Sequence, residues 1–213
     1  MTTDAITELY FDFLCPYAWR GLELADLLRR EHDLSFTLRA FSLVQGNHAE
    51  NASRRNDPVW WLSDQPRGEG PAHQQESLSA FLAERAAAQQ AGQGEARWRY
   101  ALAVLRARHQ HHQPLSAEVF RAAAQEAGLD LARFEADLAN DAERRAELRL
   151  DLAAAAEVGV FGTPTFALEP DQAAYFRFAE LVAPEQALAT WQLYTSVLAS
   201  GARIETVKRA KRA

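Results

Sequence analysis

The sequence predicts an α/β fold in which strands from both ends of the chain share one sheet and a block of helices lies between them. Residues 6–41 read as strand, helix and strand, and residues 165–198 read as two short strands followed by a helix. The segment between them shows mostly helical periodicity. Because neither end supplies enough strands for a stable sheet, we expect the two ends to meet in the same sheet.

The N-terminal elements follow from the spacing of apolar residues. Leu9, Phe11 and Phe13 alternate with polar neighbours, which predicts a strand over residues 6–13. Apolar residues at helical spacing predict a largely buried helix from Pro16 to about residue 30, and alternation returns over residues 34–41. A strand, a helix and a strand in this order predict a right-handed unit with two parallel strands.

The middle of the chain predicts a long connection followed by helices. Residues 45–71 are rich in Asn, Gly, Pro and charged residues, and we expect helices over residues 74–90 and 95–108. Three further helices are predicted from their end signals, which are the caps Ser116 and Asp130, a capping box of Asn140 with Glu143, and the stops Gly128 and Gly159. We therefore predict a discontinuous domain of residues 1–44 and 159–213, with a helical insertion domain of residues 45–158.

The C-terminal elements complete the predicted sheet. Residues 165–168 and 175–178 read as short strands separated by Pro170-Asp171, a pair that favours turns, and so predict an antiparallel hairpin. Pro184 is suited to the first turn of a helix that continues to Leu198, and Gly201 follows as a candidate stop.

The composition limits the classes of function. A net charge of −6 argues against nucleic acid as the main partner. The single cysteine excludes an intramolecular disulfide. The first residues lack the charged and apolar regions of a secretory signal, and no apolar stretch approaches the length of a membrane span. We therefore expect a cytoplasmic protein without a membrane partner.

The single cysteine, Cys15, is the leading candidate for chemistry. It stands between the first strand and a helix that opens with Pro16, whose fixed φ suits the first helical position. The unpaired N–H groups and the dipole at a helix N-terminus favour thiolate over thiol. Alone, a free cysteine is more often a small buried hydrophobe, so the surrounding pattern carries this hypothesis. Asp12 would oppose a thiolate nearby, and we assign it a structural role.

Two motifs now point to a known family. The first opens the helix and reads Cys15-Pro16-Tyr17-Ala18-Trp19-Arg20-Gly21, and the second, before the hairpin, is Gly162-Thr163-Pro164-Thr165. With the order of elements, they resemble the DsbA-like branch of the thioredoxin superfamily over nearly the whole chain. The likeness extends to cytoplasmic members with C-P-W-C-Y-x-G motifs. It also extends to 2-hydroxychromene-2-carboxylate isomerases and kappa-class glutathione transferases, which carry S-P-Y-S-like motifs.

The resemblance implies a thioredoxin-like fold with a large all-helical insertion. It also implies a cis peptide bond between Thr163 and Pro164, in a loop that lies against Cys15. In such a loop the N–H and C=O of Thr163 would be exposed to glutathione or to an extended peptide, so Thr163 and Pro164 are predicted substrate-binding residues. Pro16, Tyr17 and Ala18 complete the predicted active-site motif.

The departure from the family pattern is Ala18, which stands where dithiol oxidoreductases have their second cysteine. Without that sulfur the chain cannot resolve a mixed disulfide by itself. The sequence then favours a monothiol oxidoreductase in which an external thiol, such as glutathione, resolves the adduct on Cys15. Two alternatives stay open: a glutathione-dependent isomerase or transferase, and a binding module that has lost catalysis. An accessible thiolate would also suit a redox sensor.

The remaining candidates carry weaker signals. Asn47 resembles an asparagine in the isomerase loop, and Trp60 could form a wall of the cleft, although a turn residue and a core residue are the simpler interpretations. The cluster of His109, His111 and His112 lies at a helix end, where the dipole favours positive charge, and we expect no metal site. We expect no permanently bound cofactor, glutathione as a co-substrate, and a small thiol, a disulfide or a peptide segment as partner. A homodimer is left open.

Overall fold

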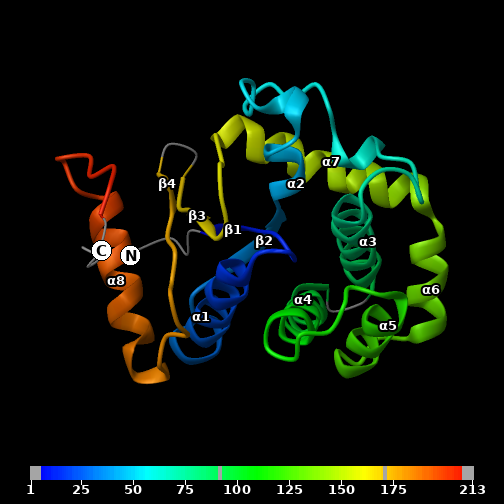
Figure 1. The fold of residues 1–213 in the computed structure, drawn as a ribbon. Coiled ribbons are helices and arrows are strands. Elements are labelled where there is room, and N and C mark those ends of the chain that lie inside the picture. Colours follow the sequence, from blue (N-terminus) through cyan, green and yellow to red (C-terminus); the bar gives the residue numbers. More distant parts are fainter. Residues whose placement is uncertain (1–5, 91–92, 170–171, 208–213) are drawn as a thin grey trace.

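The fold is built on a mixed sheet of four strands, seen in a computed structural model that describes residues 6–90, 93–169 and 172–207. The strands are β1 (Thr7–Phe11), β2 (Phe36–Ala40), β3 (Thr165–Ala167) and β4 (Ala173–Tyr175). They lie in the order β2-β1-β3-β4 (Figure 1). β1 and β2 are parallel, whereas β3 is antiparallel to both β1 and β4. The prediction that both ends of the chain share one sheet is confirmed.

Eight α-helices are found in the described residues. They are α1 (Pro16–His32), α2 (Leu43–Gly46), α3 (Ala72–Ala87), α4 (Gln93–His109), α5 (Ala117–Glu126), α6 (Leu131–Ala139), α7 (Asp141–Val158) and α8 (Ala187–Leu198). Short 3-10 helices cover Ala49–Asn51, Leu62–Asp64 and Pro184–Gln186. Helices α3 to α6 form a block beyond the β2 edge, and α8 lies beyond β4 at the other edge (Figure 1). The proposed division into two domains stays a prediction.

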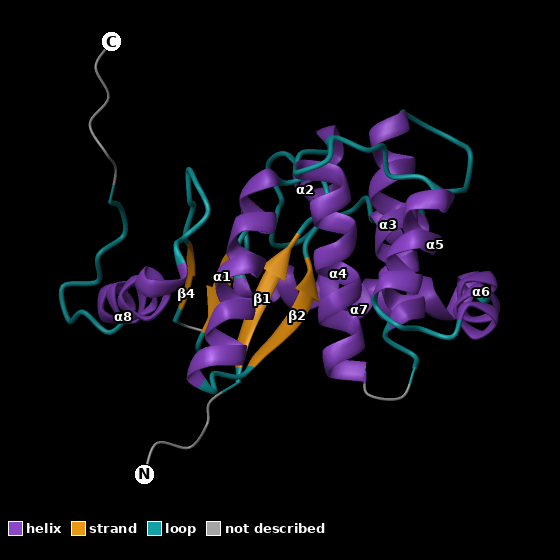
Figure 2. Cartoon of the chain, turned by 90° about the horizontal axis from the view of Figure 1, so that it is seen from below, coloured by secondary structure: helices purple, strands orange, loops and turns teal. Residues whose placement is uncertain are grey.

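Both faces of the sheet are covered. Leu9 and Phe11 of β1 belong to the large hydrophobic core, whereas Tyr10 points to the opposite face. There Tyr10 packs in a second cluster with Ala155 of α7, so the face that the sequence marks as more polar is also buried. Figure 2 shows α1 crossing the strands on one side.

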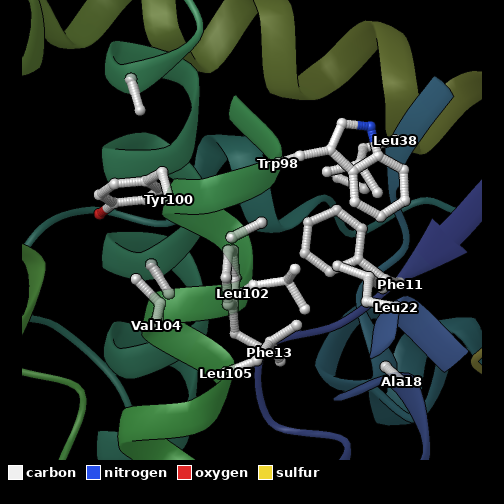
Figure 3. Packing of buried hydrophobic residues seen from close by; sticks show 14 of the residues in the cluster. Phe11, Phe13, Ala18, Leu22, Leu38, Trp98, Tyr100, Leu102, Val104 and Leu105 are labelled. Carbon is white, nitrogen blue, oxygen red and sulfur yellow. The ribbon is translucent and has the colours of Figure 1, made fainter. Parts of the chain in front are cut away.

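The large core continues from the sheet into the helical block. Trp98, Leu102 and Leu105 of α4 lie against β1 and α1 (Figure 3). Their partners in that view include Phe13 and Leu22, both fully buried. Burial of each such side chain contributes roughly 1.5 to 3 kcal/mol, and this packing holds the inserted helices against the strand that leads to Cys15.

The second hairpin strand differs from its prediction. The sequence places it at residues 175–178, but β4 is Ala173–Tyr175 and pairs Tyr175 with Thr165. The ladder ends there because Pro164, the residue before β3, has no N–H to donate. Phe176 and Phe178 pack on each other instead, with ring centroids 4.8 Å apart. The predicted turn at Pro170-Asp171 lies outside the described residues.

Most of the predicted helix ends are confirmed. The side chains of Ser116 and Asp130 accept N-cap bonds, and Gly128 and Gly159 have positive φ at the ends of their helices. The capping box at Asn140 is wrong, because the Asn140 side chain accepts no cap bond and donates to the Glu143 carboxylate instead. Gly201 does not end α8, which is capped by Ala199.

Candidate active site

Cys15 lies at the junction of β1 and α1, where its backbone forms the N-cap of the helix. Its N–H donates to the Asp12 carbonyl at 3.1 Å, and Pro16 occupies the first helical position. The sulfur makes no cap bond. Cys15 Sγ lies instead 3.4 Å from the Thr163 carbonyl oxygen, to which a protonated thiol donates. The two predicted motifs, 148 residues apart in the sequence, therefore meet at this sulfur.

The loop opposite Cys15 is held closely against α1. The peptide bond between Thr163 and Pro164 is cis, and the Pro164 carbonyl accepts a bond from the Phe176 N–H at 3.1 Å. On the helix side Pro164 packs over Gly21, where an added Cβ would lie 2.6 Å from the proline ring. The missing side chain of Gly21 thus makes room for the loop.

The expectation that the N–H and C=O of Thr163 are exposed to a ligand is wrong. Thr163 is 1% exposed and Cys15 is 5% exposed, because α1 and the hairpin close over the loop from both sides. Within the described residues the buried Thr163 hydroxyl has no hydrogen-bond partner, whereas the Thr165 hydroxyl donates to the Gly162 carbonyl at 2.8 Å. Ala18 is fully buried beside this junction.

Asp12 joins the Cys15 turn to the start of α2. Its two carboxylate oxygens accept bonds from the N–H groups of Leu14 and Leu43, each at 2.7 Å. Burial raises the pKa of Asp12 to about 6, and the two backbone bonds offset this effect only in part. Asp12 therefore stabilises the Cys15 turn through these two hydrogen bonds, which agrees with the structural role inferred from the sequence.

The raised pKa of Asp12 predicts a pH dependence of stability. Between about pH 4 and pH 6 the folded protein holds a proton on Asp12 that the unfolded chain releases. The free energy of unfolding is therefore expected to fall as pH rises through this window, by up to about 3 kcal/mol. In Asp12→Asn this decrease in the free energy of unfolding should be absent. Urea denaturation at a series of pH values measures it.

The Asp12→Asn substitution also weakens the hydrogen bonds that Asp12 accepts from the backbone. An asparagine side chain in place of Asp12 would offer one acceptor oxygen to two N–H groups, so the variant should be less stable than the wild type at pH 4 by about 1 to 3 kcal/mol. Asp57→Asn, at an exposed position, serves as the control and should retain the wild-type slope. An unchanged slope in the Asp12 variant would show that another group titrates there.

His109 is a contact to the Cys15 turn that the sequence did not predict. Its Nε2 lies 2.9 Å from the Phe13 carbonyl oxygen, and its ring stacks on Trp19. Burial lowers the pKa of His109, although the bond to the Phe13 carbonyl opposes this shift. The sequence explains the histidine cluster by the helix dipole, which favours positive charge, and burial opposes that effect at His109. Neutral His109 donates Nε2–H and links α4 to the turn.

A group of aromatic and basic side chains lies beside the Cys15 motif. The Arg177 guanidinium donates to the Tyr17 hydroxyl and lies 3.8 Å from the centre of its ring. Arg20 approaches the same ring at 5.4 Å and donates to the Phe178 carbonyl at 3.1 Å. Tyr175 lies over Gly162, 3.5 Å from where a Cβ would be. We call Tyr17, Arg20, Tyr175 and Arg177 the basic rim.

The weaker candidates lie in other surroundings. Asn47 is exposed at the end of α2, and its side-chain oxygen accepts from Arg55 at 3.2 Å. Trp60 is half-buried, stacks on His48 at 4.1 Å and packs against the core. Among the described contacts neither residue touches Cys15. Of the basic rim, only Tyr17 belongs to the active-site motif that the sequence predicts. Gly21, Arg20, Tyr175, Arg177 and His109 were missed as site residues because long-range packing brings them together.

A strand that leads into a Cys-Pro helix start, opposed by a Thr-Pro loop before a hairpin, defines a protein of the thioredoxin-like class. Residues 6–188 match the family model described as DSBA-like thioredoxin domain. The chain therefore belongs to the DsbA-like thioredoxin family, and the fold inferred from the resemblance is confirmed. None of the curated proteins compared matches it.

Solved structures with the same fold share little sequence with this chain. A 2-hydroxychromene-2-carboxylate isomerase has 17% identity and a TM-score of 0.61, covering 89% of this chain and 94% of that one. The cytosolic disulfide reductase DsbM from Pseudomonas aeruginosa, solved with GSH, has 20% identity and a TM-score of 0.57, covering 89% and 98%. A probable DsbA oxidoreductase from Streptomyces coelicolor has 17% identity and a TM-score of 0.57, covering 96% and 93%.

None of the described helices combines the length and the apolar character that crossing a bilayer requires.

Proposed function

We propose that this protein is a monothiol thiol-disulfide oxidoreductase in which Cys15 is the nucleophile and an external thiol such as glutathione resolves the adduct. The observation that carries the proposal is the position of the only thiol of the chain. Cys15 lies at the N-terminus of α1, 3.4 Å from the carbonyl of Thr163, while Ala18 leaves no second thiol. Membership of the DsbA-like family supports an enzyme of this general kind.

The reaction needs two exchange steps. In the first, the Cys15 thiolate attacks a disulfide, forms a mixed disulfide and releases one substrate thiolate. In the second, a glutathione thiolate attacks the mixed disulfide, frees Cys15 and leaves a disulfide that contains glutathione. Glutathione supplies the electrons, so it acts as a co-substrate and no bound cofactor is needed. A reducing cytoplasm would provide the second thiol.

The test is adduct formation on the full-length protein. Incubation with oxidised glutathione should add one glutathionyl group, detected by intact-protein mass spectrometry, and reduced glutathione should remove it. The turnover assay follows glutathione-dependent reduction of bis(2-hydroxyethyl) disulfide. Cys15→Ser should form no adduct and should lower turnover to the uncatalysed rate. A wild-type protein that forms no adduct and shows no turnover would contradict the proposal and favour a non-catalytic binding module.

A glutathione-dependent isomerase is the second candidate, supported by the TM-score of 0.61 to a 2-hydroxychromene-2-carboxylate isomerase. In this reaction Cys15 would position the thiol of glutathione and need not form a disulfide. The two functions separate in Cys15→Ser, because serine can still offer a hydrogen bond but cannot exchange disulfides. Glutathione-dependent isomerisation of a conjugated carboxylate that survives in this variant would favour the isomerase.

A further inference from the structure

We propose that the basic rim selects anionic substrates, so that the thiol or disulfide that reacts with Cys15 carries a carboxylate or a similar negative group. The inference rests on the proposed function and names the class of substrate for the same site. Arg20 and Arg177 would contact the anion, and Tyr17 would hold both guanidinium groups beside the Cys15 motif.

The arginines of the basic rim lack carboxylate partners among the described residues. The arginines elsewhere on α1 are paired, Arg29 with Asp26 and Glu95, and Arg30 with Asp26. In the part of the chain that the structure describes, neither Arg20 nor Arg177 has a carboxylate within ion-pair distance. Their contacts are with uncharged groups: the Phe178 carbonyl for Arg20, the Tyr17 and Tyr175 hydroxyls for Arg177, and the Tyr17 ring for both. Among the described residues, two positive charges are thus left without a neutralising side chain.

The two positive charges converge on one aromatic side chain, Tyr17. Arg20 comes from the first turns of α1, whereas Arg177 follows β4, yet both guanidinium groups lie over the ring of Tyr17. Each retains N–H donors beyond the contacts named above, since a guanidinium carries five. A planar fork of donors matches a carboxylate with two parallel bonds.

Tyr175 connects the basic rim to the Cys15 site. Burial raises the pKa of Tyr175, Arg177 opposes the rise, and negative charge on Cys15 or Tyr17 adds to it. Tyr175 is therefore within electrostatic reach of both the rim and the thiol. It also packs on Gly162, next to Thr163, whose carbonyl contacts Cys15. An anionic group held at the rim would lie beside the bond that Cys15 attacks.

The test compares iodoacetate with iodoacetamide, two reagents that differ in one negative charge. In both cases the Cys15 sulfur displaces iodide and forms a thioether, so the ratio of the two rates cancels the reactivity of the thiol itself. At low salt, the iodoacetate to iodoacetamide ratio should be higher for Cys15 than for 2-mercaptoethanol. Added salt should reduce the difference, because it screens the charges of the rim.

Charge variants then identify the residues responsible. Arg20→Gln and Arg177→Gln should each lower the ratio about threefold, in the range of a partly exposed ion pair. Arg177→Lys keeps the charge and should retain most of the wild-type ratio. Arg121→Gln, on α5 in an exposed pair with Glu135, is the control and should leave the ratio unchanged.

The outcomes separate the two proposals. A wild-type ratio equal to that of 2-mercaptoethanol, unaffected by the rim variants, would overturn anion selection, while glutathionyl adducts on Cys15 would still support the oxidoreductase. Failure of both reagents to modify native Cys15 would count against both proposals. A ratio that falls equally in Arg177→Gln and Arg177→Lys would overturn the role of charge.

Discussion

Asp151→Ala is expected to lower the free energy of unfolding by about 3 to 5 kcal/mol, because it removes a buried carboxylate that Arg39 and Arg85 share. Asp151 is 2% exposed on α7. Its Oδ1 accepts from Arg39 at 3.0 Å, and its Oδ2 accepts from the Ala40 N–H at 2.9 Å and lies 3.0 Å from Arg85. This one carboxylate therefore joins α7 to β2 and to α3.

The charges around Asp151 balance in the native protein. The network contains three carboxylates and three guanidinium groups, namely Glu8, Glu84 and Asp151 with Arg39, Arg85 and Arg97. Burial by itself would raise the pKa of Glu84, but the attraction of Arg85 and Arg97 outweighs burial and lowers it. Removal of Asp151 leaves one buried positive charge in excess, and that excess is the source of the expected loss.

Urea denaturation at pH 7 measures this loss. Glu135→Ala removes one partner of an exposed pair with Arg121 and should cost less than about 1 kcal/mol, which makes it the matched control. Asp151→Asn keeps the shape and one acceptor oxygen, so its loss should be smaller than that of the alanine variant. Equal losses for Asp151→Ala and Glu135→Ala would mean that the buried network contributes no more than a surface pair.

Gly21→Ala is expected to destabilise the protein by about 1 to 3 kcal/mol and to disturb the Cys15 site. In an ordinary helix interior the same substitution stabilises, since glycine costs roughly 0.5 to 1 kcal/mol relative to alanine. Here the sign reverses because the new Cβ would lie 2.6 Å from both Cβ and Cγ of Pro164. A proline ring cannot rotate away, so the whole loop must shift, and Thr163 moves with it.

Denaturation and alkylation together test this prediction. The shifted loop should lengthen the contact between Cys15 Sγ and the Thr163 carbonyl and expose the sulfur, so iodoacetamide should react faster with the variant. Gly94→Ala is the matched control, since Gly94 lies in α4 and its Cβ would meet nothing within 4 Å. If Gly21→Ala is as stable as Gly94→Ala and reacts at the wild-type rate, the close packing of Pro164 on α1 has no energetic consequence.

Much of the fold could be predicted because its signals are local. Alternation along residues 6–13 marks β1, and Ser116 and Asp130 mark helix starts through bonds to residues three positions away. The second hairpin strand was misplaced because its register depends on where β3 stops, which is set by Pro164 on another segment. Aromatic residues favour strands, but Phe176 finds only the Pro164 carbonyl as a partner, because proline has no N–H to donate in return.

The sequence by itself determined the class of fold, the position of Cys15 at the start of a helix, and the absence of a second thiol at Ala18. These properties depend on residue identity and on short spacings. Only the tertiary structure decided that Thr163 is buried, that His109 holds the Cys15 turn, and that Arg20 and Arg177 converge on Tyr17. The physical reason is that burial and charge pairing arise between segments far apart in the chain, and no local pattern records which of them will meet.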